Sequence, residues 1–283
     1  MGAVSDVMTP DEFKLFRDLI HNECGIFSKE EKRDFLKVRV EKRLKTLNMG
    51  SFFNYYRYVR EERNRRELSS LLDSITINET YFFRNTPQFE ILREKVIPEL
   101  IERKRKAGDY NLMAWSAGCA TGEEAYSIAI EILEAIPDIS RWNVQVIASD
   151  ISWRCIEIGQ SGVYPGEKLK DVPPEYLTKY FTYSGEFYQV SDNVKRLVIF
   201  DFHNLKHENG LTKVDVIFCR NVMIYFDIEE QKRIVARFRK VLNKDGYLFL
   251  GHAESLQGIA NGDFRFLYLN KGTAYQKVKA ADE

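Results

Sequence analysis

The apolar and polar residues of the first 75 positions follow the spacing of amphipathic helices. Thr9 with Glu12 and Ser28 with Glu31 each form the pattern of a capping box, and Gly25 is a natural stop between the two helices they predict. The apolar faces are Phe13, Phe16, Leu19 and Ile20 in the first helix and Leu36, Val40, Leu44 and Leu47 in the second. Because these positions recur every three or four residues, this part of the chain is expected to be all-helical.

Beyond this region short apolar runs alternate with helical segments. The expected strands are Leu112–Trp115, Val144–Ala148, Val214–Cys219 and Tyr247–Leu250, followed by an antiparallel hairpin of Phe264–Leu269 and Thr273–Val278. This alternation predicts an α/β fold with a mostly parallel, Rossmann-like sheet and helices on both faces. A helix from Thr86 to about Lys106 is expected to bend near Pro98, and residues 243–246 are expected to form a turn.

Residues 159–194 interrupt the alternation with prolines and a hairpin-like pattern over 181–190, whose tip is at Gly185. We expect this interval to form a small antiparallel β lobe inserted into the main sheet domain. The sequence therefore predicts an N-terminal helical domain over residues 1–75 and a second domain over residues 76–283.

The first expected strand breaks into a glycine turn from Gly118 to Gly122, which a helix follows at once. A strand, a glycine turn and a helix allow a nucleotide-like ligand to approach the backbone. Here Glu123 and Glu124 occupy the helix start, where they would repel the pyrophosphate that a helix N-terminus otherwise attracts. A ligand with an adenosine and a positive centre fits better, and S-adenosyl-L-methionine has both.

Asp150 closes the second expected strand, where an acid in nucleotide-binding folds accepts hydrogen bonds from two ribose hydroxyls. The alternative is a solvated loop acid, but the glycine turn one unit earlier favours the ribose role. Asn78, Thr80 and Arg84 form a polar cluster among large apolar residues. This cluster is either a linker with an incidental ion pair or a site where the Arg84 fork binds a carboxylate of the donor or the acceptor.

Arg220, Asn221 and Tyr225 follow the buried strand at its carboxyl end, the edge at which open α/β sheets bind ligands. Tyr225 either orients an oxygen acceptor or serves packing. His203 and His207 are four positions apart but lie in a loop-like stretch without a third ligand at metal spacing. We therefore expect surface histidines and no metal site.

The charge of the chain is balanced, with 42 Lys and Arg against 42 Asp and Glu, so the molecule as a whole is no polyanion binder. Between residues 29 and 67, however, 13 basic residues face 7 acidic ones. Arg39, Lys42 and Lys45 project away from the seam of the second helix. Such a face is usually only solvated, but in a separate small domain it also predicts a docking surface for an acidic partner.

Apolar runs in the sequence fall short of the ~20 residues that a membrane span requires, and a secretory signal pattern is missing from the start of the chain. The four cysteines show neither a CxxC pair nor a regular framework, which indicates reduced thiols. We expect a cytoplasmic protein without membrane insertion.

Four motifs together resemble one family: Asn-Glu-Thr-Tyr-Phe-Phe-Arg84, Trp-Ser-Ala-Gly-Cys-Ala-Thr-Gly-Glu-Glu124, Ala-Ser-Asp150 and Phe-Cys-Arg-Asn-Val-Met-Ile-Tyr-Phe226. They resemble, in the same order, the bacterial chemotaxis receptor methyltransferases of the CheR family, and the likeness covers nearly the whole chain. The resemblance implies a class I S-adenosyl-L-methionine-dependent methyltransferase fold. It also implies O-methylation of glutamate side chains on the cytoplasmic helical bundle of methyl-accepting chemotaxis receptors, with S-adenosyl-L-homocysteine as the second product.

The resemblance also implies roles for individual residues. The residues that would bind the donor are Asn78, Thr80, Arg84, Gly118, Glu124, Asp150, Asn204, Leu205, Arg220 and Asn221. Arg84 and Tyr225 would lie nearest the transferred methyl group and are the expected catalytic residues. Arg39, Lys42 and Lys45 would face the receptor. Some members of the family are tethered to a receptor pentapeptide through the β lobe. Because the hairpin around Thr182–Phe187 looks shorter here, we expect a tether-independent enzyme, and we expect it to be a monomer.

Three rival interpretations remain at this stage. A nucleic-acid methyltransferase would use the basic helices to bind phosphates, but the chain lacks the Asn-Pro-Pro-Tyr-like motif of adenine-amino methyltransferases. A donor-binding sensor without catalysis is the second alternative, and the complete motif set argues against it. A dehydrogenase is disfavoured because the Gly-x-Gly-x-x-Gly spacing is absent.

Overall fold

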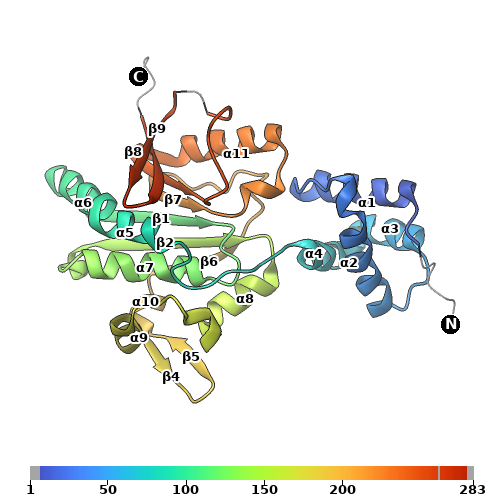
Figure 1. Ribbon diagram of the computed structural model, residues 1–283, viewed down its shortest axis with the longest axis horizontal. Helices are drawn as coiled ribbons and strands as arrows, with labels where there is room; N and C mark the ends of the chain where they lie inside the picture. Colours follow the sequence, from blue (N-terminus) through green and yellow to red (C-terminus); the bar gives the residue numbers. More distant parts are fainter. Residues whose placement is uncertain (1–6, 261, 279–283) are drawn as a thin grey trace.

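The computed structural model describes residues 7–260 and 262–278. Its N-terminal part is a bundle of four helices, α1 (Pro10–Cys24), α2 (Arg33–Thr46), α3 (Phe52–Arg60) and α4 (Arg65–Ile75). Figure 1 shows this bundle on one side of the main sheet, joined to it by the segment that follows α4. The bundle has its own apolar core, which Phe13, Phe16, Val40 and Leu44 help to form. The predicted apolar faces therefore meet one another.

The helix boundaries confirm one predicted capping box and contradict the other. Thr9 accepts a hydrogen bond from the backbone of Glu12, the Glu12 side chain bonds back to Thr9, and Gly25 ends α1 in a left-handed conformation. The box predicted at Ser28 and Glu31 is wrong, because a 3₁₀ turn over Glu30–Lys32 precedes α2 instead.

The main sheet has seven strands in the order β6-β2-β1-β7-β8-β10-β9. The strands are β1 (Asn111–Ala117), β2 (Asn143–Asp150), β6 (Val198–Phe202), β7 (Val214–Cys219), β8 (Leu242–Leu250), β9 (Phe264–Leu269) and β10 (Gly272–Lys277). β6, β2, β1, β7 and β8 are parallel, and β10 pairs antiparallel to both β8 and β9. This arrangement confirms the predicted mostly parallel sheet with a closing antiparallel hairpin.

Side chains alternate between the two faces of the sheet, so each face has its own core. Ala114 and Phe218 belong to the core under α5 (Thr86–Ile91), α6 (Ile97–Lys106) and α7 (Glu123–Ala135), whereas Trp115 and Cys219 belong to the core under α11 (Ile228–Val241). The helical run before β1 contains a π-helical segment, Leu92–Val96, directly ahead of α6. The helix that was expected to bend near Pro98 is thus interrupted by π-helical geometry just before that proline.

Two local expectations for the sheet are corrected. Residues 243–246 do not form a turn, because β8 runs through them with a bulge opposite Val214 and Val216 and with Asp245 at a positive φ of 58°. The edge strand β6 was not expected from the sequence. Its residues alternate between half-buried and exposed, so its pattern differs from the apolar runs of the inner strands.

The interval between β2 and β6 contains a second, three-stranded antiparallel sheet in the order β3-β5-β4. Its strands are β3 (Val163–Pro165), β4 (Phe181–Tyr183) and β5 (Phe187–Val190), and Gly185 lies between β4 and β5 at a φ of 88°. This confirms the predicted β lobe, which lies beside α7 and α8 (Trp153–Ser161) in Figure 1. The lobe also contains two short helices that the sequence reading missed, α9 (Pro174–Tyr180) and α10 (Asp192–Lys195).

Candidate active site

A cavity lies at the carboxyl ends of β1, β2, β6 and β7, where the N-terminal bundle meets the sheet. The predicted donor-binding and catalytic residues all line it: Asn78, Thr80, Arg84, Gly118, Glu124, Asp150, Asn204, Leu205, Arg220, Asn221 and Tyr225. The sheet contributes the loops after its strands, and the bundle contributes Cys24, Ile26 and the segment after α4. The structure thus brings residues from distant parts of the chain together around one cavity.

The glycine turn after β1 forms the floor of the cavity. Gly118 has a φ of 82°, and a Cβ atom there would lie 2.6 Å from Cγ2 of Val222. The N–H groups of Gly118 and Cys119 both donate to the carbonyl of Ser149, which ties the turn to the end of β2. Glycine is therefore required both by the left-handed conformation and by the close approach of the loop after β7.

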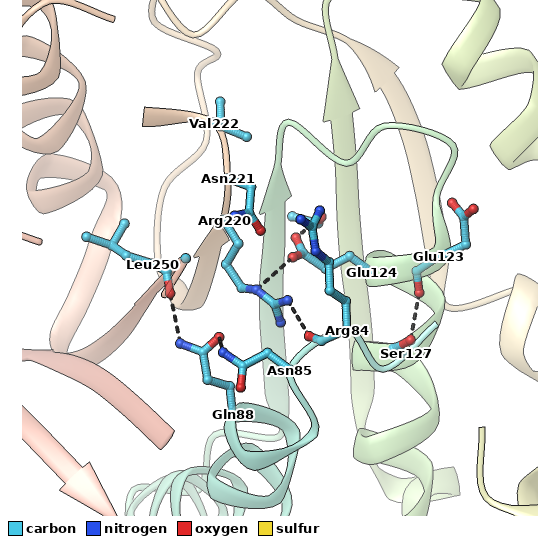
Figure 2. Close-up of polar contacts among 12 residues, drawn as sticks. Arg84, Asn85, Gln88, Glu123, Glu124, Ser127, Arg220, Asn221, Val222 and Leu250 are labelled. Carbon is cyan, nitrogen blue, oxygen red and sulfur yellow. Dashed lines mark hydrogen bonds and ion pairs between the residues drawn. The ribbon is translucent and has the colours of Figure 1, made fainter. Parts of the chain in front are cut away.

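The two acidic residues at the start of α7 have different environments. Glu124 lines the cavity, accepts a 2.7 Å hydrogen bond from the Ser116 hydroxyl and lies 3.4 Å from Nε of Arg220. Figure 2 shows that the Glu123 side chain points away from Glu124 and Arg220. It accepts a 2.6 Å hydrogen bond from the Thr121 hydroxyl and lies 3.3 Å from Lys168. The cavity therefore receives one carboxylate from this helix start, that of Glu124, which is the one of the two glutamates expected to bind the donor.

Burial raises the pKa of Glu124, although the nearby Arg220 guanidinium opposes this effect. Asp150 is also buried, and desolvation raises its pKa while two backbone N–H groups oppose the shift. These donors are Ala120, at 2.8 Å, and Ser152, at 2.9 Å, and each binds a different carboxylate oxygen. A carboxylate oxygen has a second lone pair, so Asp150 can still accept bonds from a diol.

Two arginines, Arg84 and Arg220, also line the cavity. Arg220 is buried beside the rings of Phe89 and Phe218, and its Nη2 donates to the backbone carbonyl of Arg84 (Figure 2). Its Nε and Nη1 have no hydrogen-bond partner among the residues that the structure describes. Arg84 donates through Nη1 to the carbonyl of Glu79 at 2.9 Å. The cavity therefore presents guanidinium donors in addition to the carboxylates of Glu124 and Asp150, and one of these donors lies directly beside Glu124.

Asn204 lines the cavity and also links the sheet to the N-terminal bundle. Its side-chain amide donates a 2.7 Å hydrogen bond to the carbonyl of Glu23, and its side-chain oxygen accepts from the N–H of Lys206. The Lys206 ammonium in turn bonds the carbonyls of His21 and Asn22. The end of α1 is thus held by the loop after β6.

Tyr225 lies half-buried in the same wall, and its backbone is joined to the N-terminal part of the chain. Its carbonyl accepts a 2.8 Å hydrogen bond from Phe27, and Ile26 forms an antiparallel bridge with Phe226. Burial raises the pKa of the Tyr225 hydroxyl, while Arg84 opposes the shift. The phenol is therefore protonated at neutral pH and available as a hydrogen-bond donor.

Several cavity residues were not found from the sequence. Cys24, Ile26 and Ile151 belong to no motif that indicates a binding site, and they line the cavity only because the fold places them there. The surface position expected for His203 is wrong: its ring lies 6.1 Å from Trp115, its Nε2 is buried, and desolvation lowers its pKa. His207 is exposed, as expected.

The basic residues predicted to bind a partner lie on α2, away from the cavity wall. Lys42 and Lys45 are exposed, and Arg39 lies partly over the ring of Phe35 at 4.9 Å. Arg43 differs from them, because it turns inward to a bidentate ion pair with Glu67.

Comparison with known proteins agrees with this architecture. The sequence matches the model of the CheR methyltransferase SAM-binding domain over residues 78–273 and that of the CheR all-alpha domain over residues 11–76. The chain belongs to the CheR methyltransferase family. It is accordingly an S-adenosyl-L-methionine-dependent methyltransferase with a class I fold, an N-terminal all-α region and a small antiparallel sheet.

Relatives of this CheR chain are similar over nearly their full length. Chemotaxis protein methyltransferase 2 of Vibrio cholerae is 35% identical over 275 residues, which is 96% of this chain and 94% of the relative. The chemotaxis protein methyltransferase of Borreliella burgdorferi is 32% identical over 91% of this chain and 92% of its own. The chemotaxis protein methyltransferase of Salmonella typhimurium is 36% identical over 91% of this chain and 86% of its own length.

The cavity of the CheR chain fits its donor. S-adenosyl-L-methionine combines a ribose diol, an ammonium, a carboxylate and a sulfonium. The carboxylates of Asp150 and Glu124 accept hydrogen bonds, while Arg84 and Arg220 supply cationic donors, with Arg220 directly beside Glu124. A cavity that contains both carboxylates and guanidinium groups matches the zwitterionic end of this molecule.

Proposed function

We propose that this CheR methyltransferase, which acts in chemotaxis, transfers the methyl group to glutamate side chains of methyl-accepting chemotaxis receptors, giving glutamate 5-O-methyl esters. The observation that carries the proposal is the position of Tyr225 and Arg84 on the same cavity as Glu124 and Asp150. A donor held by the two acids would direct its far end toward the tyrosine and arginine. The family and the names of the relatives, which are chemotaxis protein methyltransferases, support an acceptor that takes part in chemotaxis.

The chemistry needs no general base, because a glutamate carboxylate is already ionised at neutral pH. The acceptor oxygen attacks the sulfonium methyl in line, the C–S bond breaks, and its electron pair stays on sulfur as S-adenosyl-L-homocysteine forms. The enzyme accelerates the reaction by aligning the acceptor oxygen with the methyl group and by removing water from the acceptor carboxylate. Among the described residues that line the cavity, Cys24, Cys119, Asp150 and His203 are not joined to one another by side-chain hydrogen bonds, which is consistent with this reaction.

The residues of the cavity divide between the two substrates in this proposal. Asp150 would hold the ribose diol, Glu124 the ammonium group and Arg84 mainly the carboxylate of the donor, because a tight bond from Arg84 to the acceptor oxygen would reduce its nucleophilicity. Tyr225 would orient the acceptor carboxylate with its phenol. Asn78, Thr80, Gly118, Asn204, Leu205, Arg220 and Asn221 would complete the donor site.

The two parts of the chain would divide the work. Residues 76–283 would bind the donor and catalyse transfer, while residues 1–75 would dock the receptor through Arg39, Lys42 and Lys45. The receptor would contribute an acidic helical surface, and no nucleic acid would be bound. The short hairpin between β4 and β5 supports activity without a pentapeptide tether. No helix within residues 7–260 and 262–278 is long and apolar enough to cross a membrane, and we propose a cytoplasmic monomer.

The test uses methyl-labelled S-adenosyl-L-methionine and membranes that contain chemoreceptors, followed by mild alkali. Label on the receptor that leaves as methanol would establish a carboxyl ester. The Asp150→Ala variant, which loses the proposed ribose contact, should transfer far less label. Base-stable label, or label found on nucleic acid, would overturn the proposed acceptor and favour amine or nucleobase methylation.

A further inference from the structure

The carboxylate of Glu254 binds four backbone N–H groups beside the cavity. Oε2 accepts from Asn221 at 2.8 Å and from Gly251 at 2.6 Å, and Oε1 accepts from Val222 at 2.9 Å and from Ile224 at 3.3 Å. Three of these donors belong to the loop that follows β7, about 30 residues away in the sequence. One side chain therefore satisfies most of the backbone donors at the start of this loop.

The neighbouring glycine makes room for this carboxylate. A Cβ atom on Gly251 would lie 2.6 Å from Oε2 of Glu254 and 2.8 Å from the backbone nitrogen of Asn221. Both distances are shorter than real Cβ contacts allow, so only glycine at the end of β8 lets Glu254 reach the loop. This is a second, independent sign that the contact is built into the fold.

The loop that Glu254 binds is the wall on which donor and acceptor are expected to meet. Its Asn221 has a left-handed φ of 59°, which is unusual for a residue with a side chain, and Val222 packs against the Gly118 turn. Tyr225 follows at the cavity. Glu254 itself lies behind this wall and is not among the described residues that line the cavity.

We propose that Glu254 is a positioning residue for methyl transfer. By binding the N–H groups of Asn221, Val222 and Ile224, its carboxylate holds Asn221 in its left-handed conformation and Tyr225 at its place on the cavity wall. Its action on Asn221 needs only the donor cavity, whereas its action on Tyr225 rests on the proposed function. The residue touches neither substrate and acts through the loop.

The Glu254→Gln variant tests the charge and the acceptor count together. Each carboxylate oxygen accepts two N–H bonds, so an amide in either orientation points its NH₂ at two donors. Hydrogen bonds to a charged group are worth enough that the loss of two should weaken S-adenosyl-L-methionine binding about tenfold or more. The turnover number per donor-binding site should fall by a similar factor. Glu208→Gln is the matched control, because this exposed glutamate bonds the Lys240 side chain and should leave both quantities within about twofold.

Calorimetric titration with the donor alone gives affinity and the number of sites per chain, and label transfer to receptor membranes gives turnover. Gly251→Ala should act in the same direction, because its methyl group displaces the carboxylate. Unchanged affinity and unchanged turnover per site in both variants would overturn the proposal. So would a loss of activity that is fully explained by fewer binding sites, since this would mean misfolding. If the unmodified protein methylates no receptor, the acceptor assignment fails while donor affinity still decides the role of Glu254.

Discussion

Nε of Arg220 lies 3.4 Å from Oε2 of Glu124 in the cavity wall, where the Arg220 side chain is 3% exposed and the Glu124 side chain 12% exposed. We expect Arg220→Met to lower the free energy of unfolding by about 3 kcal/mol or more, because it leaves a largely buried carboxylate without its cation. Donor affinity should also fall. Urea denaturation and calorimetric titration with S-adenosyl-L-methionine measure the two effects.

The double variant Glu124→Gln, Arg220→Met separates charge pairing from packing. It removes both charges, so we expect it to be more stable than Arg220→Met alone. Its donor affinity should remain low, because the proposed contact of Glu124 with the ammonium is lost. A double variant whose destabilisation equals the sum of the two single variants would contradict direct pairing of these residues.

The hydrogen bond from Asn204 to the carbonyl of Glu23 links the donor cavity to the end of α1. We expect Asn204→Ala to weaken donor binding about fivefold, the scale of one or two lost hydrogen bonds. The amide of Phe27, which donates to Tyr225, should exchange with solvent faster because this junction is loosened. Hydrogen exchange and titration with the donor test both statements.

The matched control is Asn64→Ala. The Asn64 amide also donates to a backbone carbonyl, that of Tyr58 at 2.9 Å, but within the N-terminal bundle. It should leave donor affinity and Phe27 exchange unchanged. Equal effects of the two variants would mean that the bundle responds as a whole, without a specific role for the Asn204 contact.

The parts of the site that the sequence predicts are those encoded by neighbouring residues. Gly118 is required by the turn that its own strand and helix make, and Asp150 ends an apolar strand that is evident from its pattern. Parallel strands bring their carboxyl ends to one edge, so the Gly118 turn, Asp150 and the Arg220–Asn221 pair were expected to be near one another. The strand order confirms this proximity.

The parts that the sequence does not predict depend on distant partners. Glu123 and Glu124 are adjacent at one helix start, and their different directions are set by Lys168 on the β-lobe side and Arg220 after β7. The sequence around Glu254 predicts only a loop acid, and its contact with Asn221 arises because β8 ends beside the loop after β7. Cys24 lines the cavity because the end of α1 is held there, a contact between segments far apart in sequence. Local patterns carry no information on such contacts.

The stability of the protein should depend on pH through Glu131. This side chain is buried on α7, 3.5 Å from Arg93, and desolvation raises its pKa from 4.5 to about 8 in spite of the arginine. Between pH 4.5 and about pH 8, Glu131 is therefore protonated in the folded state and ionised in the unfolded chain. Because unfolding releases this proton, the free energy of unfolding falls as the pH rises through this range. We expect Glu131→Gln to remove this loss, which is on the order of 4 kcal/mol across the window.

Urea unfolding of both proteins at several values from pH 5 to pH 8 checks this prediction. The stability difference in favour of Glu131→Gln should grow with pH. Glu134→Gln is the control on the same helix, because hydrogen bonds from Lys179 and Tyr180 lower the pKa of Glu134 against the effect of burial. Glu134 is ionised in both states over most of this range, so its stability difference should change far less with pH. A small change remains because the charge of Glu134 helps to raise the pKa of Glu131. A constant difference for Glu131→Gln would contradict its raised pKa.

The exposed lysines of α2 should affect the acceptor and leave the donor unaffected. Lys42 and Lys45 are exposed on a helix outside the cavity wall, so Lys42→Glu with Lys45→Glu should keep donor affinity within about twofold. If the receptor presents an acidic surface, this double reversal should raise KM for receptor about tenfold or more at low salt, because attraction becomes repulsion. The effect should shrink at 0.5 M salt, where the Debye length is only about 4 Å. The control is Lys106→Glu, which reverses an exposed charge on α6 and should leave KM for receptor unchanged. If KM rises equally in this control, the effect comes from net charge and not from a docking surface on α2.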